Sequence, residues 1–192
     1  MENKILEIYK ETIYSSKLDQ NICKESFEYI LPLKEKFQQK SWDCDIRTSL
    51  NITNNILNIP RLRNLKMNII MHIENYMMEK KEFFNGYIDT SWINIYEKNF
   101  FQEYHTHVDP ISKFISGVIY LTEKNSSIEF SFSHHFDSFL FAPKFSDILL
   151  FEDSIPHRVI NNKEDLRVSL AFNYRKCDKW TGVKTDDPTL FT

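Results

Sequence analysis

Three side chains that can bind a metal ion stand at alternate positions in the segment His105-Thr106-His107-Val108-Asp109. In an extended chain, residues i, i+2 and i+4 project to the same face, so His105, His107 and Asp109 would share one pocket. Imidazole and carboxylate ligands together suit iron, manganese or zinc. A pair of alternating histidines by itself is more typical of a hydrogen-bonding strand edge than of a metal site, so further evidence is needed.

A third histidine and an arginine follow in the second half of the chain. His157 comes 50 residues after His107, near the start of the predicted strand that follows the apolar run 148–151. Ten residues later, alternation sends Arg167, Ser169, Ala171 and Asn173 to one face of another strand. A guanidinium offers a planar fork of donors suited to a carboxylate, and a nearby hydroxyl adds a hydrogen bond. Taken alone, Arg167 also fits a surface salt bridge.

The segments that must position these residues differ between the two halves of the chain. Two segments in the first 80 residues have helical periodicity, and their apolar positions are Ile5, Ile8, Tyr9 and Ile13 in one and Leu65, Ile69, Ile70, His72, Ile73 and Met77 in the other. Between them, residues 42–48 predict an extended strand, and residues 51–60 are rich in turn-forming residues. We expect both helices to pack as scaffold and His72 to be a packed or hydrogen-bonded histidine.

From about Gly86 the chain changes to short aromatic and β-branched runs separated by polar turns. These runs predict eight strands, near 88–97, 100–107, 114–121, 127–133, 138–142, 147–151, 156–160 and 167–174. Helices followed by strands indicate an α+β fold with the helices on one outer face of a jelly-roll-like β layer. We expect one domain over 1–192, with a mainly helical support region at 1–85, a β core at 86–176 and a C-terminal extension at 177–192.

Composition narrows the class of protein. The 192-residue chain has a net charge of −3 and a pI near 6.1, so no long-range field favours nucleic acid as a partner. The N-terminus MENKILEIYKETIY lacks the apolar stretch of a secretory signal, and no run is long enough to span a membrane, so we expect a cytoplasmic protein. The three cysteines, Cys23, Cys44 and Cys177, are widely separated and are expected to be reduced thiols.

Over residues 90–175 the order of motifs resembles the 2-oxoglutarate- and Fe(II)-dependent oxygenases, whose core is a double-stranded β-helix of the jelly-roll or cupin-like kind. It is most similar to a small branch common in marine bacteria and their phages. The motifs that carry the resemblance are Trp92-Ile93-Asn94-Ile95-Tyr96, His105-Thr106-His107, Ser116-Gly117-Val118-Ile119-Tyr120-Leu121, Leu149-Leu150-Phe151, His157-Arg158-Val159 and Arg167 through Asn173.

The resemblance implies roles for the motif residues. His157 would be the distal iron ligand, and Arg167 would pair with the far carboxylate of 2-oxoglutarate, assisted by Ser169. Asn94 and Tyr96 match a pair that touches the same cosubstrate in related nucleic-acid dealkylases. The implied cofactors are Fe(II), 2-oxoglutarate and O2, and no catalytic residue is expected beyond the metal site.

Two assignments of the proximal metal ligands fit the sequence. His107-Val108-Asp109 matches the usual H-x-D motif literally, whereas the spacing from Asn94 puts His105 and His107 at the usual His and Asp positions. We favour His105, His107 and His157, with Asp109 as a substitute ligand or as an acceptor that orients a ligand imidazole. The adjacent histidines at 134 and 135 would point to opposite faces of a regular strand and would not share a metal.

The implied activity is hydroxylation of a C–H bond in a small molecule or a peptide side chain, with release of succinate and CO2. One alternative is a jelly-roll protein that binds a metal or ligand without catalysis, because one fold hosts many functions. Another is a three-histidine dioxygenase that does not use 2-oxoglutarate. Arg167 favours the first function, since a simple metal binder needs no carboxylate clamp ten residues after its distal ligand.

Overall fold

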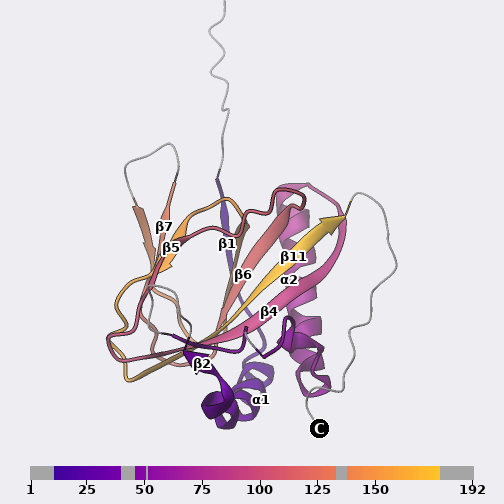
Figure 1. Cartoon of the computed structure of the whole chain (residues 1–192). Helices are drawn as coiled ribbons and strands as arrows, with labels where there is room; N and C mark the ends of the chain where they lie inside the picture. Colours follow the sequence, from indigo (N-terminus) through magenta and orange to yellow (C-terminus); the bar gives the residue numbers. More distant parts are fainter. Residues whose placement is uncertain (1–10, 40–45, 51, 133–137, 178–192) are drawn as a thin grey trace, which may run out of the picture.

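Two antiparallel sheets lie face to face in the computed structural model, which describes residues 11–39, 46–50, 52–132 and 138–177 (Figure 1). The larger sheet has the order β1 (Ile13–Lys17), β9 (Asp147–Glu152), β6 (Phe114–Tyr120), β11 (Leu166–Cys177), β4 (Asn85–Glu97), β3 (Arg47–Thr48) and β2 (Gln38–Gln39). The smaller sheet has the order β5 (Gln102–His105), β10 (His157–Val159), β7 (Ile128–Ser131) and β8 (Ser138–Phe141). Neighbours in the larger sheet come from distant parts of the chain, which is the connectivity of a jelly roll.

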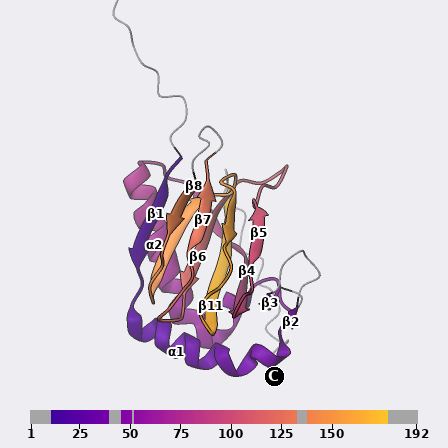
Figure 2. The same ribbon diagram turned by 90° about the vertical axis from the view of Figure 1, so that its left-hand side faces the viewer.

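Helix α2 lies along the outer face of the larger sheet, and α1 runs across one end of the sheet (Figure 2). Helix α1 (Gln20–Ile30) begins at Asp19, whose carboxylate accepts hydrogen bonds from the first-turn backbone amides. Helix α2 (Arg63–Lys80) ends at Lys81 in the left-handed conformation, with φ of 56°. Three short 3-10 helices, Leu31–Lys36, Ile56–Asn58 and Pro60–Leu62, connect the helices to the strands. None of the helices in the described part of the chain is long and apolar enough to cross a membrane.

The larger sheet separates two apolar cores. On its outer face, isoleucines and leucines of the central strands pack against both helices. On its inner face, a smaller cluster fills the space between the sheets, formed by Val118, Tyr120, Ile128, Phe130, Leu149, Phe151 and Ile155. Apolar residues therefore occupy both faces of the central strands, which explains the nearly continuous apolar runs in β6 and β9.

The predicted α+β fold, with a double-stranded β-helix core and helices on one face, is confirmed. Each of the eight strands expected between residues 88 and 174 forms, and β11 continues to Cys177. The second predicted helix is α2, in which His72 is buried with Nδ1 3.2 Å from the Tyr14 hydroxyl.

The N-terminal region differs from the prediction. Ile13, expected in a helix, lies in strand β1 and pairs with Phe151. Ile13 packs into the core between the sheets, and the next residue, Tyr14, packs into the helix-side core, which is the alternation of a strand. Helix α1 was not predicted at all. Residues 5, 8, 9, 42–45, 134, 135 and 178–192, on which other predictions rested, lie outside the described residues.

Candidate metal centre

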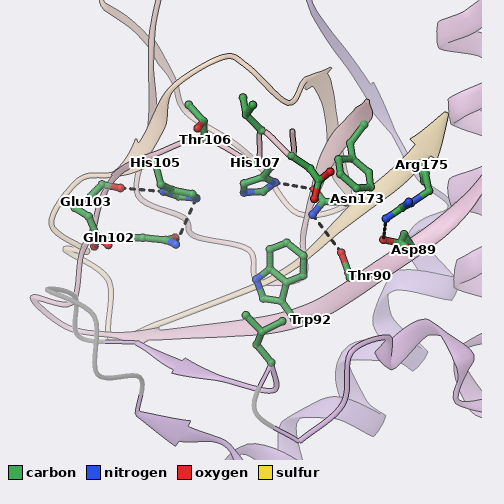
Figure 3. Close-up of a pocket in the computed structure, with 14 residues that line it drawn as sticks. Asp89, Thr90, Trp92, Gln102, Glu103, His105, Thr106, His107, Asn173 and Arg175 are labelled. Atoms are coloured by element: carbon green, nitrogen blue, oxygen red, sulfur yellow. Dashed lines mark hydrogen bonds and ion pairs between the residues drawn. The ribbon is translucent and has the colours of Figure 1, made fainter. Parts of the chain in front are cut away.

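Two histidines of the smaller sheet and a third just beyond β5 converge at one end of the space between the sheets. His105 ends β5, His107 lies two residues beyond it, and His157 begins β10 directly opposite His105. One ring nitrogen from each histidine lies within 4.8 Å of those of the other two. Figure 3 shows His105 and His107 projecting side by side from the same segment. The chain thus brings together three of the residues that the sequence analysis singled out.

Each imidazole is oriented by an oxygen atom on its Nδ1 side. His105 Nδ1 lies 2.9 Å from the Glu103 carbonyl, and His157 Nδ1 lies 3.1 Å from the Ile155 carbonyl. His107 Nδ1 lies 2.7 Å from Oδ1 of Asn173. A carbonyl oxygen only accepts hydrogen bonds, so each contact requires a proton on Nδ1 and leaves the lone pair on Nε2. This is the arrangement of metal-binding histidines, whose second nitrogen donates to a fixed acceptor.

Burial keeps these three rings neutral. Burial lowers the pKa of His105, and burial together with the nearby His105 lowers the pKa of His107 to about 4. The pKa of His157 lies well below its usual value, because the ring is buried and faces both other histidines. At neutral pH all three therefore carry the lone pair that a metal ion needs.

Asp109 is not part of this group. Its Oδ1 accepts hydrogen bonds from the backbone amides of Ile111 and Ser112, each at 2.8 Å, and these bonds hold its pKa below the usual range. The carboxylate therefore stabilises the turn that follows the histidines. Among the described residues, the potential ligands that converge are His105, His107 and His157.

Behind the histidines lies an inner pocket whose wall includes the four residues expected to bind a cosubstrate. They form two cross-strand pairs, because Arg167 is opposite Tyr96 and Ser169 is opposite Asn94 in the pairing of β11 with β4. The same pocket is lined by all three histidines. The alternation predicted for β11 thus places these polar side chains on the inner face of the larger sheet.

Arg167 is the most unusual residue of this pocket. It is 1% exposed, and its Nε and Nη1 atoms are buried with no hydrogen-bond partner among the described residues. Its guanidinium lies over the rings of Tyr96 and Tyr120, at 4.6 Å and 5.3 Å from their centroids. No described residue forms an ion pair with it, and a buried unpaired charge is costly, so the site is suited to an anionic ligand.

Sequence reasoning missed several contacts around the histidines. Gln102 lies between the inner pocket and His105, since its Oε1 accepts a hydrogen bond from the Tyr96 hydroxyl at 2.7 Å and its Nε2 lies 3.5 Å from His105 Nε2. The ring of Trp92 lies 5.6 Å from that of His107. No pattern in the sequence indicated Gln102, whereas Asn173 was already on the polar face of its strand.

Asn94 supports the Trp92 ring. In the amide orientation that satisfies both polar atoms, the side-chain oxygen of Asn94 accepts a hydrogen bond from Trp92 Nε1 at 3.2 Å. Its side-chain nitrogen donates to Thr48 Oγ1 at 3.1 Å. The residue expected to touch a cosubstrate therefore also holds a side chain beside the metal centre.

A larger outer pocket of about 470 Å³ opens on the other side of the histidines (Figure 3). Its apolar lining comes from Leu50, Trp92, Val108 and Phe114, and its charged lining comes from Asp89, Glu103, Asp109 and Arg175. Arg175 and Asp89 form an ion pair at 3.3 Å. The outer and inner pockets share the side chains of His105 and His107.

Solved structures with this architecture are numerous. A prolyl-4-hydroxylase from Pseudomonas putida superposes with a TM-score of 0.69 and 11% identity, over 87% of this chain and 94% of that one. The fold is that of the 2OG-Fe(II) oxygenases. An oxidoreductase of the 2OG-Fe(II) oxygenase family from Burkholderia pseudomallei gives a TM-score of 0.58 at 16% identity, over 78% and 77% of the two chains.

A third neighbour was solved with a bound peptide fragment. It is a prolyl hydroxylase from Trichoplax adhaerens in complex with a hypoxia inducible factor oxygen degradation domain peptide, with a TM-score of 0.64 and 11% identity, covering 86% of this chain and 83% of that one. No family model matches the chain, and no curated protein matches it in sequence. At identities this low the likeness establishes the fold, and the function has to be argued from the site.

Proposed function

We propose that the chain is an Fe(II)- and 2-oxoglutarate-dependent dioxygenase in which His105, His107 and His157 hold the iron. The observation that carries the proposal is Arg167, a buried cation whose Nε and Nη1 have no hydrogen-bond partner in the described part of the chain. It lies in a pocket that the three histidines also line. A dicarboxylate with one end at the metal and the other at this guanidinium would satisfy both. The solved structures with this fold include 2OG-Fe(II) oxygenases.

The donor set fits iron. Imidazole nitrogens suit Fe, Zn and Cu, and three protein ligands leave positions for a cosubstrate and O2. Ser169, buried beside Arg167, would add a hydrogen bond to the bound 2-oxoglutarate, and Asn94, opposite Ser169, would line the same wall of the pocket. Tyr96, opposite Arg167, would form part of the same wall.

When bound, Fe(II), 2-oxoglutarate and O2 supply the oxidising power that hydroxylates a C–H bond with release of succinate and CO2. The protein contributes orientation and exclusion of water. Phe130 and Phe151 pack against the ring of His157, at centroid distances of 6.0 Å and 4.8 Å, and close the inner side of the site. Water is thereby kept from the buried side of the metal centre.

The outer pocket would receive the primary substrate. Its volume of about 470 Å³ suits a small molecule or one side chain of a peptide. The combination of the Trp92 ring with charged groups on the rim supports a substrate that has both an apolar part and a polar part. The Trichoplax neighbour, which was solved with a peptide, makes a peptide substrate a reasonable first choice for screening.

A second candidate function is a three-histidine dioxygenase that acts without 2-oxoglutarate. The observation in its favour is the ligand set itself, which has no carboxylate among the converging side chains of the described residues. Such an enzyme would leave the partnerless nitrogens of Arg167 unexplained. For this reason the 2-oxoglutarate-dependent function is preferred.

The two functions differ in a direct experiment. Under anaerobic conditions, addition of Fe(II) and then 2-oxoglutarate should produce a visible charge-transfer absorption band, with succinate replacing 2-oxoglutarate as the control that gives none. In air, oxygen consumption should then require 2-oxoglutarate. Oxygen consumption with Fe(II) alone and no band would support the second function instead. Absence of Fe(II) binding would contradict both.

A further inference from the structure

The three histidines are not oriented in the same way. His105 and His157 each donate from Nδ1 to the carbonyl two residues earlier in their own chain segment, so the acceptor is supplied by the backbone. His107 instead uses the side chain of Asn173, which is 66 residues away. Its orientation therefore depends on side-chain contacts, which substitutions can remove, and the Asn173 contact is the shortest of them.

His107 also has less support from the sheet than the other two histidines. It lies beyond the last residue of β5, and its backbone amide donates to the Asp153 carbonyl at 2.9 Å. His105 and His157, in contrast, are paired with each other across β5 and β10. The His107 ring is therefore the one that most needs a side-chain contact.

Asn173 is held in place by a polar row across three neighbouring strands. In register, it stands between Ser116 on β6 and Thr90 on β4. Its Nδ2 donates to Thr90 Oγ1 at 3.2 Å, and its Oδ1 accepts a hydrogen bond from the Ser116 hydroxyl at 3.1 Å. The Ser116 oxygen also lies 2.9 Å from His107 Nδ1. With its nitrogen held by Thr90, the amide presents its oxygen to His107 (Figure 3).

We propose that Asn173 is a positioning residue that fixes His107 in the Nδ1–H tautomer, with Nε2 free as the metal ligand. The part of this inference that concerns metal rests on the proposed function, whereas the tautomer itself is a property of the metal-free protein. Contacts of this kind set the ring orientation and basicity of a ligand histidine, and their loss typically costs about 10–100-fold in metal affinity.

The variants Asn173→Leu and Asn173→Asp test whether the amide acts as an acceptor for His107. Asn173→Leu removes the acceptor while keeping a similar volume. Asn173→Asp keeps an acceptor for His107 but cannot donate to Thr90. If Asn173 fixes the tautomer of His107, Asn173→Asp should preserve the Nδ1–H tautomer and Asn173→Leu should not.

The first measurement is the ring tautomer of His107 in the metal-free protein, read from long-range proton–nitrogen NMR spectra and assigned by comparison with His107→Gln. We expect Nδ1–H in the wild type and in Asn173→Asp, and a mixture of tautomers or Nε2–H in Asn173→Leu. A wild-type His107 that carries its proton on Nε2 would overturn the inference even if no variant could be purified.

The second measurement is Co(II) binding, followed by visible absorption and by titration. Asn173→Leu should weaken binding by about 10–100-fold and change the spectrum, and Asn173→Asp should restore most of the affinity. Asn55→Leu is a matched control, because Asn55 is also a buried amide, bonded to the Ile88 carbonyl and the Ser91 hydroxyl away from the histidines. It should lower the melting temperature without changing the Co(II) spectrum.

The outcomes distinguish the two proposals. Wild-type protein that binds neither Co(II) nor Fe(II) would contradict the proposed function, while the tautomer result would still decide the role of Asn173. Wild-type protein that binds metal, with Asn173→Leu binding it equally well and with an unchanged His107 tautomer, would overturn the role of Asn173 alone.

Discussion

His105 and His157 face each other in register across β5 and β10, with their ring centroids 4.3 Å apart. The pairing of two strands thus sets the distance between two potential ligands that are separated by 52 positions in the chain. Because backbone hydrogen bonds hold this pairing, the two imidazoles are arranged before any metal binds. Such preorganisation lowers the cost of forming a metal site.

Removal of His105 should have a much larger effect on metal binding than removal of Asp109. His105→Ala deletes one of three converging nitrogens, and we expect Fe(II) or Co(II) affinity to fall by at least about 100-fold. Asp109→Ala removes only the acceptor for two turn amides, so affinity should stay within about threefold. Isothermal titration of both variants checks this. The reverse order would assign the proximal ligands to His107 and Asp109.

Replacement of Arg167 by Met should abolish 2-oxoglutarate binding without lowering the stability of the ligand-free protein. The guanidinium is buried, and no described side chain or backbone group bonds its Nε or Nη1, so an apolar side chain of similar length is expected to leave stability unchanged or increase it. The melting temperature of the wild type should rise on addition of Fe(II) and rise further with 2-oxoglutarate. The melting temperature of Arg167→Met should rise with Fe(II) but not increase further with 2-oxoglutarate.

An equal 2-oxoglutarate-dependent increase in both proteins would contradict the role of Arg167. Arg167→Lys is the matched variant, because it keeps the charge and loses the fork of donors. We expect it to bind 2-oxoglutarate more weakly than the wild type and more tightly than Arg167→Met.

Glu152 should stabilise the contact between α2 and the larger sheet in a pH-dependent way. Its carboxylate lies 2.9 Å from the amines of Lys80 on α2 and Lys176 on β11, and Tyr76 donates to it at 3.2 Å. Burial alone would raise the pKa of Glu152, but the hydrogen bonds and charges of the two lysines lower it below its usual value. A lowered carboxyl pKa contributes stability above the unfolded value near 4.5, and this stability is lost as pH falls through the lower folded value.

Glu152→Gln should therefore lose about 1–2 kcal/mol of unfolding free energy at pH 7. The difference from the wild type should shrink progressively below pH 4.5, because the wild-type carboxyl becomes neutral. Urea unfolding at pH 7 and at pH 3.5 measures both values. A difference that stays constant with pH would show that the charge of Glu152 does not contribute.

Any side chain in place of Gly117 on β6 should destabilise the fold. A Cβ atom at this position would overlap the ring of Phe172, its partner on β11. We expect Gly117→Ala to destabilise the fold by about 1–3 kcal/mol through overpacking. In a Phe172→Leu background the same substitution should cost less, because the smaller side chain makes room. Equal costs in both backgrounds, measured by thermal unfolding, would exclude the ring as the reason.

Local patterns were sufficient to predict most of the β region. Alternation along β11 correctly separated the polar face of Arg167 and Ser169 from the apolar face of Val168 and Leu170, because side chains alternate in any extended chain. Turn residues between apolar runs were enough to predict eight strands. The same reasoning failed at Ile13, where the spacing of apolar residues was compatible with a helix and pairing with β9 decided for a strand.

The sequence by itself determined that His105, His107, His157 and Arg167 were available for chemistry on a β scaffold. Only the tertiary structure decided which side chains converge. Asp109 remained an alternative ligand in the sequence analysis, but in the structure its carboxylate accepts hydrogen bonds from the backbone amides of Ile111 and Ser112. The contact of His107 with Asn173 joins positions 66 residues apart. Local periodicity carries no information on such distances, since they are set by the register between strands.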